Sequence, residues 1–298
     1  MELRIGRQIN RLTDRIDRYV SNNDGQQQPT VLNMIKLYND YGLSVMMSCM
    51  FSIDTIDVNS GVYQSLSGIL TPSHWRILLL LLMPGSLLRL LFNITHPFPS
   101  RLLDVFVQLT SEQIKQRLIN NDSSTTTDTL QYGDEPKYIT CDEVVANLFA
   151  MFEAGSCTNS TIIAFITYDL ATNPQIQDRL YDELIANCMD NREEQLDCDR
   201  LLRNDYLDAV VAESLRLNSS TLREGRIAAS DYQLGDTGIV IARGQAVEFA
   251  KHAVHYCTDY YPEPNCFNPD RFLPANRHSI QPYAYLPFGA GSLSISQM

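Results

Sequence analysis

Two oppositely charged residues, Glu213 and Arg216, lie one helical turn apart in the segment ESLR. Their i, i+3 spacing places a carboxylate and a guanidinium on the same face of a helix, where they can form an ion pair. Taken alone, such a pair is most simply an exposed salt bridge, which adds little stability. The alternative is a buried pair with a structural role, and these four residues do not decide between the two.

A second candidate site is the patch of small and polar residues 154–160 (AGSCTNS), which interrupts a long apolar pattern. Glycine inside a helix costs about 1 kcal/mol relative to alanine, so Gly155 needs a reason. One reason is close packing against a crossing helix. The other is a helix that opens locally, so that a flat ligand and a small molecule can approach its backbone.

A third candidate is the turn PFGAG, residues 287–291, which follows an Arg-Phe-Leu-Pro stretch. Glycine lets a bound group approach the main chain closely because it has no side chain. We therefore expect this turn to hold something against its backbone.

The elements that must position these residues are mostly helical. Thr140 and Glu143 have the spacing of a capping box, and the apolar pattern that follows reaches Asn173-Pro174, where a helix should stop. We therefore predict one long helix from about Thr140 to Ala171. Two further helices are predicted over 175–186 and 205–217.

After these helices the hydrophobic period becomes strand-like. Glycine-containing turns separate three short strand candidates, 232–234, 239–241 and 245–249. The sequence thus predicts a mainly α protein with a small β region between Ala229 and Phe249. The low-complexity stretch 120–136 is predicted to be a loop.

Composition excludes several classes of protein. The chain has 298 residues, of which 44% are hydrophobic and 19% charged, as expected for a globular protein. Its net charge of −12 argues against a nucleic-acid partner, because such binding depends on neutralising phosphates. Seven scattered cysteines without a C-x-x-C pair indicate free thiols. The apolar segment 77–94 is interrupted by Pro84-Gly85 and Arg89, which favours buried or interfacial helices over a membrane span.

The order of the motifs resembles the cytochrome P450 family. A helix with A-G-x-x-T is followed by an E-x-x-R helix, a small sheet, N-P-D-R-F at 268–272 and the P-F-G-A-G turn. The flanking segments look most like the animal microsomal branch, which has broad, lipophilic substrates. The resemblance implies a partial cytochrome P450 fold, with residues 1–298 forming one partial domain. The family's N-terminal anchor, first sheet and early helices are expected before Met1, and the helix after the haem loop is expected after Met298.

The resemblance also gives structural roles to three charged residues. Glu213 and Arg216 match the family's E-x-x-R pair, and Arg271 matches its third member. Together they would lock the region beneath the haem. Arg226 matches a position that pairs with a haem propionate, and Arg223 is the alternative because the spacing after Arg216 is one residue short.

In the long helix, the resemblance assigns a catalytic role to Thr158, which would help to deliver protons to iron-bound dioxygen. Ala154 and Gly155 of the same motif would lie against the haem. The usual acidic neighbour of the threonine is replaced by Cys157, and the following hydroxyl residue by Asn159. A buried thiol tends to stay protonated and is a poor substitute for a carboxylate in a relay.

The family's haem loop runs F-x-x-G-x-x-x-C-x-G, and the thiolate of its cysteine ligates the iron. Phe288 and Gly291 fit this pattern and would contact the cofactor. The position of the cysteine, however, holds Ile295, the usual basic residue is Leu293 and the second glycine is Gln297. Since isoleucine has no lone pair, we expect no protein ligand for the iron.

The implied activity is that of a haem-thiolate monooxygenase. It would insert one oxygen atom from O2 into a lipophilic substrate, with electrons from NADPH passed by a reductase. Full-length members would sit on the endoplasmic reticulum membrane at its cytoplasmic face, and this chain without an anchor would be cytosolic or peripheral. Three hypotheses stay open: an incomplete or misread sequence of a working enzyme, a degenerate haem-free paralogue that binds apolar molecules or has no activity, and an unrelated helical scaffold.

Overall fold

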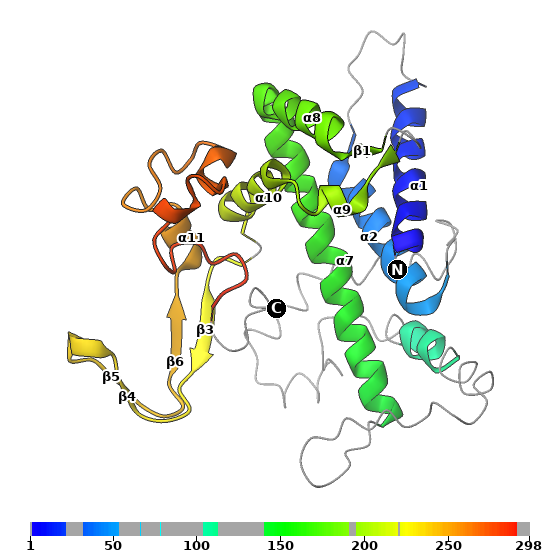
Figure 1. Cartoon of the computed structure of the whole chain (residues 1–298). Coiled ribbons are helices and arrows are strands. Elements are labelled where there is room, and N and C mark those ends of the chain that lie inside the picture. The colour runs from blue at the N-terminus through cyan, green and yellow to red at the C-terminus, as the bar shows by residue number, and fades with distance from the viewer. Residues whose placement is uncertain are drawn as a thin grey trace. The chain divides into compact units, whose positions relative to one another are not determined.

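The computed structural model describes residues 2–21, 32–53, 66, 78, 104–112, 140–190, 195–219 and 221–290. The chain divides into two compact units, Met1–Thr161 and Ile162–Met298, and the boundary falls inside one helix. Each unit is described by itself below, and Figure 1 labels their elements.

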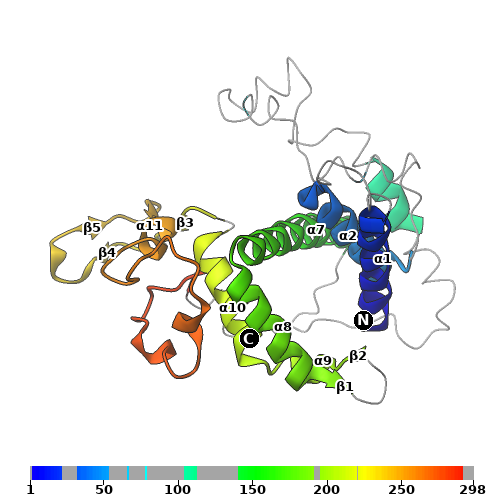
Figure 2. The same cartoon turned by 90° about the horizontal axis from the view of Figure 1, so that it is seen from above.

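The first unit is helical where it is described. Helices α1 (Glu2–Ser21) and α2 (Met34–Phe51) lie side by side in Figures 1 and 2. Their neighbour in this unit is the first part of α7 (Cys141–Thr172). An aromatic cluster forms the core, in which Phe51 of α2 packs edge-on against Phe106 with ring centroids 5.6 Å apart.

Helix α7 begins with the predicted capping box. The backbone N–H of Glu143 donates to Thr140 Oγ1 at 3.3 Å, and the backbone N–H of Thr140 donates to Glu143 Oε2 at 2.8 Å. The helix ends at Thr172, directly before Asn173-Pro174. The prediction of one long helix is therefore confirmed, with each end one residue from the expected position.

The patch of small residues in α7 is a close helix contact. A Cβ added to Gly42 of α2 would overlap Ser160 Oγ and lie 2.8 Å from the carbonyl oxygen of Ser156. One added to Gly155 would lie 2.9 Å from Sδ and Cε of Met46. The close-packing interpretation is thus confirmed. The alternative, a local opening of the helix, is not seen, because α7 is helical throughout the patch.

The second unit continues from the end of α7 into α8 (Pro174–Cys188) and α10 (Asp205–Leu217). Between them lie β1 (Met189–Asp190), β2 (Gln195–Leu196) and the short α9 (Cys198–Leu201). Helices α8 and α10 lie side by side in both views (Figures 1 and 2) and are joined by an apolar core. The buried residues of that core are Leu180, Tyr206, Val210 and Phe267.

A polar contact ties α7 to α10 within this unit. Asp169 of α7 is buried and accepts hydrogen bonds from Ser214 Oγ at 2.6 Å and from Asn218 Nδ2 at 2.8 Å. Burial raises the pKa of the Asp169 carboxyl, while these two donors act in the opposite direction. The contact holds the C-terminal end of α10, which carries Glu213 and Arg216.

The β region follows α10. Strand β3 (Glu224–Ile227) pairs antiparallel with β6 (Ala246–Phe249), and β4 (Tyr232–Gln233) pairs antiparallel with β5 (Val240–Ile241). A 3-10 turn, η1 (Gly235–Thr237), connects β4 and β5 at the far end of the same ribbon (Figure 1). The fold class, mainly α with a small β region, is confirmed.

One boundary of the β region was predicted incorrectly. The region begins at Glu224 and not at Ala229, because β3 supplies the partner that β6 needs for its backbone hydrogen bonds. Its sequence, EGRI, has a single strongly apolar residue, and three of its four residues are exposed, so the strand has no hydrophobic signal.

The last elements are α11 (Lys251–His255), η2 (Pro269–Phe272) and η3 (Arg277–Ser279). Element η2 packs against α10, and the buried core between them includes Ala209, Tyr261 and Phe272. Six cysteines have described side chains, and all six carry free thiols, as predicted.

Two of the predicted segments before α7 fall on residues that the structure does not describe. These are the loop at 120–136 and, apart from Leu78, the apolar segment 77–94. Within the described ranges, no helix has the length and apolar character needed to cross a membrane.

Candidate functional site

Helix α10 brings Glu213 and Arg216 together in its last turns. Both side chains are 0% exposed. Arg216 Nε donates to Glu213 Oε2 at 2.7 Å and Arg216 Nη2 donates to Glu213 Oε1 at 2.8 Å, which is the two-bond arrangement that suits a guanidinium and a carboxylate. The pair is therefore buried, and the simpler interpretation as an exposed salt bridge is wrong.

Arg271 approaches the same carboxylate from η2. Its Nε lies 3.5 Å from Glu213 Oε1, close enough for charge attraction but without the geometry of a hydrogen bond. Its Nη2 donates to the carbonyl oxygen of Glu263 at 3.0 Å, and the side chain is 12% exposed. The structure thus brings the three residues of the expected triad together, with Arg271 held less tightly than Arg216.

His255 of α11 joins α10 to the chain before the PFGAG turn. Its Nδ1 lies 3.1 Å from the carbonyl oxygen of Arg216, and its Nε2 accepts the backbone N–H of Leu286 at 3.0 Å. This pattern requires a neutral ring with the proton on Nδ1. Burial, with the nearby cations of Lys251 and Arg216, lowers the pKa of His255 to about 4.

Lys251 is fully buried and sits beneath the turn. Its Nζ donates to Thr221 Oγ1 at 2.6 Å, to the carbonyl oxygen of Pro287 at 3.1 Å and to Glu224 Oε1 at 3.3 Å. A buried ammonium with three acceptors is fully satisfied. Lys251 therefore links α11, the first residue of β3 and the start of the PFGAG turn.

The turn itself lies beside β3. Gly289 has a φ of +77°, a conformation that favours glycine, and a Cβ added there would lie 3.8 Å from Arg226 Nη2. The Arg226 side chain is 53% exposed, and its Nη1 lies 3.8 Å from Glu224 Oε2. Phe288 is 55% exposed. The structure therefore places Arg226 and Phe288 at one exposed edge of the second unit.

Arg223, the alternative to Arg226, has a different partner. Its Nη1 lies 3.0 Å from Glu248 Oε2, and its side chain is 72% exposed. Of the two arginines, Arg226 is the one that the structure records beside the turn. This geometry favours Arg226 for any contact with a group held by the turn.

The residues expected from the α7 motif lie in the first unit. Thr158 is exposed, and its hydroxyl donates to the carbonyl oxygen of Ala154 in its own helix. Asn159 likewise donates through Nδ2 to the carbonyl oxygen of Gly155 at 2.9 Å. Gly155 itself packs against Met46. The polar side chains of this patch therefore satisfy the backbone of their own helix.

The remaining residues of the expected haem loop, Gly291 and Ile295, lie outside the described residues. Among the residues that the structure does describe, no group of three or more His, Cys, Asp or Glu side chains could hold a metal ion.

Sequence reasoning assigned no role to Lys251 or His255. His255 follows Ala253 and Val254, and its contacts with Arg216 and Leu286 lie 39 and 31 residues away in the chain. Lys251 stands alone in an apolar context, and a lysine is rarely buried without a partner. Its three acceptors come from positions 30, 27 and 36 residues away in the chain, which no local pattern can show.

Comparison with known proteins identifies relatives of this chain. The cytochrome P450 family model matches residues 1–293. The chain is 37% identical over 151 residues to cytochrome P450 9e2 of Blattella germanica and 37% identical over 164 residues to probable cytochrome P450 6a18 of Drosophila melanogaster. It is 29% identical over 297 residues to cytochrome P450 3A9 of Rattus norvegicus.

These matches cover 50%, 55% and 95% of this chain, respectively. They cover 28%, 32% and 58% of the lengths of the three relatives. The hypothesis of an unrelated helical scaffold is therefore wrong. The chain belongs to the cytochrome P450 family, whose cofactor is haem.

Proposed function

We propose that the chain is part of one cytochrome P450 domain and that, as written, it does not activate oxygen. The observation that carries the proposal is Ile295, which occupies the cysteine position of the loop pattern that begins at Phe288. In the family, the cysteine thiolate pushes electron density towards the iron-bound oxygen and favours O–O cleavage. Isoleucine can supply neither the bond to iron nor this electron density.

The described residues could contact a haem propionate, but none of them is proposed as a ligand of the haem iron. Arg226 is half-exposed and lies beside the turn, and its Nη1 donates to the carbonyl oxygen of Gly225 at 2.8 Å and lies 3.8 Å from Glu224 Oε2. Its Nη2, the atom nearest to Gly289, could donate to a propionate. The buried ion pair of Glu213 and Arg216 fixes the last turns of α10. With Ile295 at the ligand position, the chain does not fit a thiolate-ligated haem.

The proton relay is a second obstacle to oxygen activation. Thr158 donates to Ala154 in its own helix, and Asn159 donates to Gly155. The acidic neighbour expected of the family is replaced by Cys157, whose thiol is half-buried. With a thiol in the place of the acidic side chain, this patch offers no carboxylate to pass protons.

A longer or corrected sequence with the cysteine in place would be a haem-thiolate monooxygenase. We extend to that protein the family's reaction, in which one oxygen atom from O2 enters a lipophilic substrate. Its partner would be an NADPH-dependent reductase, and its place the cytoplasmic face of the endoplasmic reticulum membrane. The cofactor would carry the chemistry, while the protein would orient the substrate and ligate the iron.

The alternative is a degenerate paralogue that binds apolar molecules without haem. The same residue, Ile295, favours this candidate, because an apolar side chain replaces the ligand in an otherwise matching loop. Saturable binding of an apolar fluorescent dye that added haem does not displace would support it.

Turnover tests the proposal. The 298-residue chain, expressed with a haem precursor, is mixed with NADPH, a microsomal reductase and a lipophilic probe. We expect no NADPH-dependent oxidation of the probe, whereas a cytochrome P450 with an intact F-x-x-G-x-x-x-C loop oxidises it in parallel. Oxidation by this chain above the level seen without reductase contradicts the proposal.

A further inference from the structure

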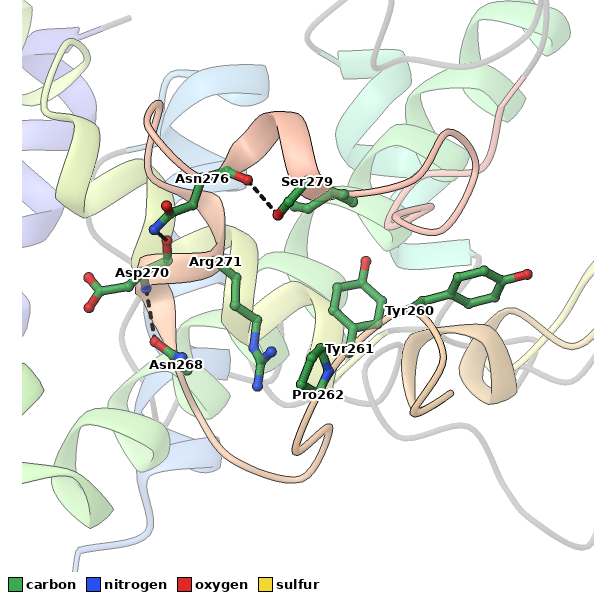
Figure 3. Close-up of a pocket in the computed structure, with 9 residues that line it drawn as sticks. Tyr260, Tyr261, Pro262, Asn268, Asp270, Arg271, Asn276 and Ser279 are labelled. Carbon is green, nitrogen blue, oxygen red and sulfur yellow. Dashed lines mark hydrogen bonds between the residues drawn. The ribbon is translucent and has the colours of Figure 1, made fainter.

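A pocket of about 260 Å³ lies in the loop region between α11 and η3, within the second unit. Figure 3 shows its labelled residues. Tyr260, Pro262 and Ile280 contribute apolar surface, and Arg271 contributes a positive charge. In the close-up, the Arg271 guanidinium points towards Tyr261 and Pro262. The pocket thus combines one cation with an apolar wall.

The guanidinium of Arg271 has donors to spare. Of its five N–H groups, one hydrogen bond is present, from Nη2 to the carbonyl oxygen of Glu263 at 3.0 Å. Its Nε is buried and lies 3.5 Å from Glu213 Oε1 without a hydrogen bond, so the donors left for a ligand are those of Nη1 and Nη2. With the side chain only 12% exposed, water can reach little of it. A charged group in this state gains free energy from a ligand that accepts its hydrogen bonds.

Glu213 does not accept a hydrogen bond from the Arg271 guanidinium. Its Oε2 accepts Arg216 Nε, and its Oε1 accepts both Arg216 Nη2 and the backbone N–H of Asn268. The three charged side chains carry a net charge of +1, since two arginines face one carboxylate. The surplus positive charge lies on the side of the pocket, at Arg271.

Three other polar side chains of the pocket have hydrogen-bond partners. Asn276 Nδ2 donates to the carbonyl oxygen of Asp270 at 2.8 Å, and Ser279 Oγ donates to that of Asn276 at 2.7 Å. The Asp270 carboxylate points away from the Arg271 guanidinium in Figure 3 and accepts Arg179 Nη1 at 2.7 Å. Arg271 is the one cation among the residues that line the described pocket.

We propose that this pocket binds the carboxylate of a small organic acid, with its apolar body against Tyr260, Pro262 and Ile280. A carboxylate matches the planar fork of a guanidinium and carries one negative charge, which one arginine can balance. A phosphate dianion would lack a second cation. The inference stands apart from the proposed function, because it requires neither haem nor the PFGAG turn.

Calorimetric titration of the full chain at low salt tests the proposal, with benzoate as the probe and benzamide as its uncharged analogue of the same shape. We expect benzoate to bind at least about tenfold more tightly than benzamide, since a hydrogen-bonded charge contributes more than a neutral group. Inorganic phosphate should bind more weakly than benzoate. Equal binding of benzoate and benzamide, tighter binding of phosphate, or no benzoate binding at all overturns the proposal.

Two variants place the binding in this pocket. Arg271→Lys keeps the charge but removes the fork, and we expect benzoate affinity to fall about tenfold, while the matched control Arg223→Lys leaves it unchanged. Ser279→Trp leaves the Glu213–Arg216 pair intact, fills the pocket and should abolish binding, so the test holds even if Arg271→Lys does not fold. Unchanged benzoate binding in folded Ser279→Trp contradicts the assignment.

Discussion

The Glu213–Arg216 pair is held by more than its own two hydrogen bonds. Asn268 donates its backbone N–H to Glu213 at 2.9 Å, and Arg216 Nη1 donates to the carbonyl oxygen of His255 at 2.8 Å. The Arg216 guanidinium also lies 4.9 Å from the ring centroid of Tyr261. Loss of either charge would therefore leave a buried ion and several backbone groups without partners.

We expect Arg216→Ala to lower the free energy of unfolding by about 3–5 kcal/mol, the usual cost of breaking a buried ion pair from one side. Arg223→Ala is the matched control, because its partner Glu248 lies at the surface, and it should cost less than about 1 kcal/mol. Urea denaturation followed by circular dichroism measures both. Equal costs for the two variants would show that burial of the pair does not matter.

Lys251 provides a second prediction at the scale of residues. Lys251→Met has a similar length and removes the charge, which leaves the carbonyl oxygen of Pro287 without its donor and Glu224 Oε1 with only the hydroxyl of Thr221. We expect a loss of about 2–4 kcal/mol and faster hydrogen exchange at Phe288 and Gly289. The double variant Lys251→Met with Glu224→Gln should recover part of the stability. An exchange pattern unchanged at the turn would argue against the link.

His255 makes the stability depend on pH. Its pKa is about 4 in the folded chain, below the ordinary value of about 6.5, so the unfolded chain binds the proton more readily. This contribution to stability is fully present above about pH 6.5 and is lost as the pH falls towards 4, with a slope of at most about 1.4 kcal/mol per pH unit. Unfolding measured between pH 4 and 7 should show a flatter profile in His255→Gln than in the parent chain. An identical profile in the variant would rule out His255 as the cause.

At the scale of elements, α2 and α7 approach each other through glycine and serine, residues with no side chain or a small one. Gly42 faces Ser156 and Ser160 of α7, and the Ser160 hydroxyl lies 2.8 Å from the carbonyl oxygen of Tyr38. The small-residue patch in α7 is thus explained by packing. Its polar side chains donate hydrogen bonds to helix carbonyl oxygens.

Gly42→Ala should destabilise the first unit by about 1–3 kcal/mol, because the added methyl group overlaps α7 and the helices must move apart. Gly6→Ala in α1 is the control, since a Cβ there meets nothing within 4 Å and alanine favours a helix by about 1 kcal/mol. Thermal unfolding of the two variants should shift in opposite directions. A stabilising Gly42→Ala would show that the two helices are not in close contact.

Much of the helical structure could be predicted from local sequence. The capping box at Thr140, the stop at Asn173-Pro174 and the span 205–217 all rest on interactions within a few residues, and the structure has them. Strand β3 was missed because its pairing with β6 is not encoded in the four residues EGRI. Burial of Glu213 and Arg216 likewise depends on η2 and α11, which lie tens of residues away. The i, i+3 spacing predicts that the two side chains form an ion pair, but their burial is visible only in the tertiary structure.

At the scale of the whole molecule, the family pattern is distributed over both units. The patch of small residues lies in Met1–Thr161, while the buried arginines, β3 and the start of the PFGAG turn lie in Ile162–Met298. The residues of the buried Glu213–Arg216 pair match the family pattern, whereas the position expected to hold the cysteine ligand carries Ile295. The scaffold and the chemistry of this chain therefore depend on different residues.

The central claim is that this chain has no thiolate ligand for haem iron. It is tested most directly by the absorption spectrum of the 298-residue chain after addition of haem, reduction and treatment with CO. A thiolate-ligated haem gives a red-shifted Soret band under these conditions, and we predict that the band is absent. Ile295→Cys is the informative comparison, although Leu293 and Gln297 also depart from the family loop and should keep its recovery small. A red-shifted Soret band from the unaltered chain would contradict the account, because another residue would then have to ligate the iron.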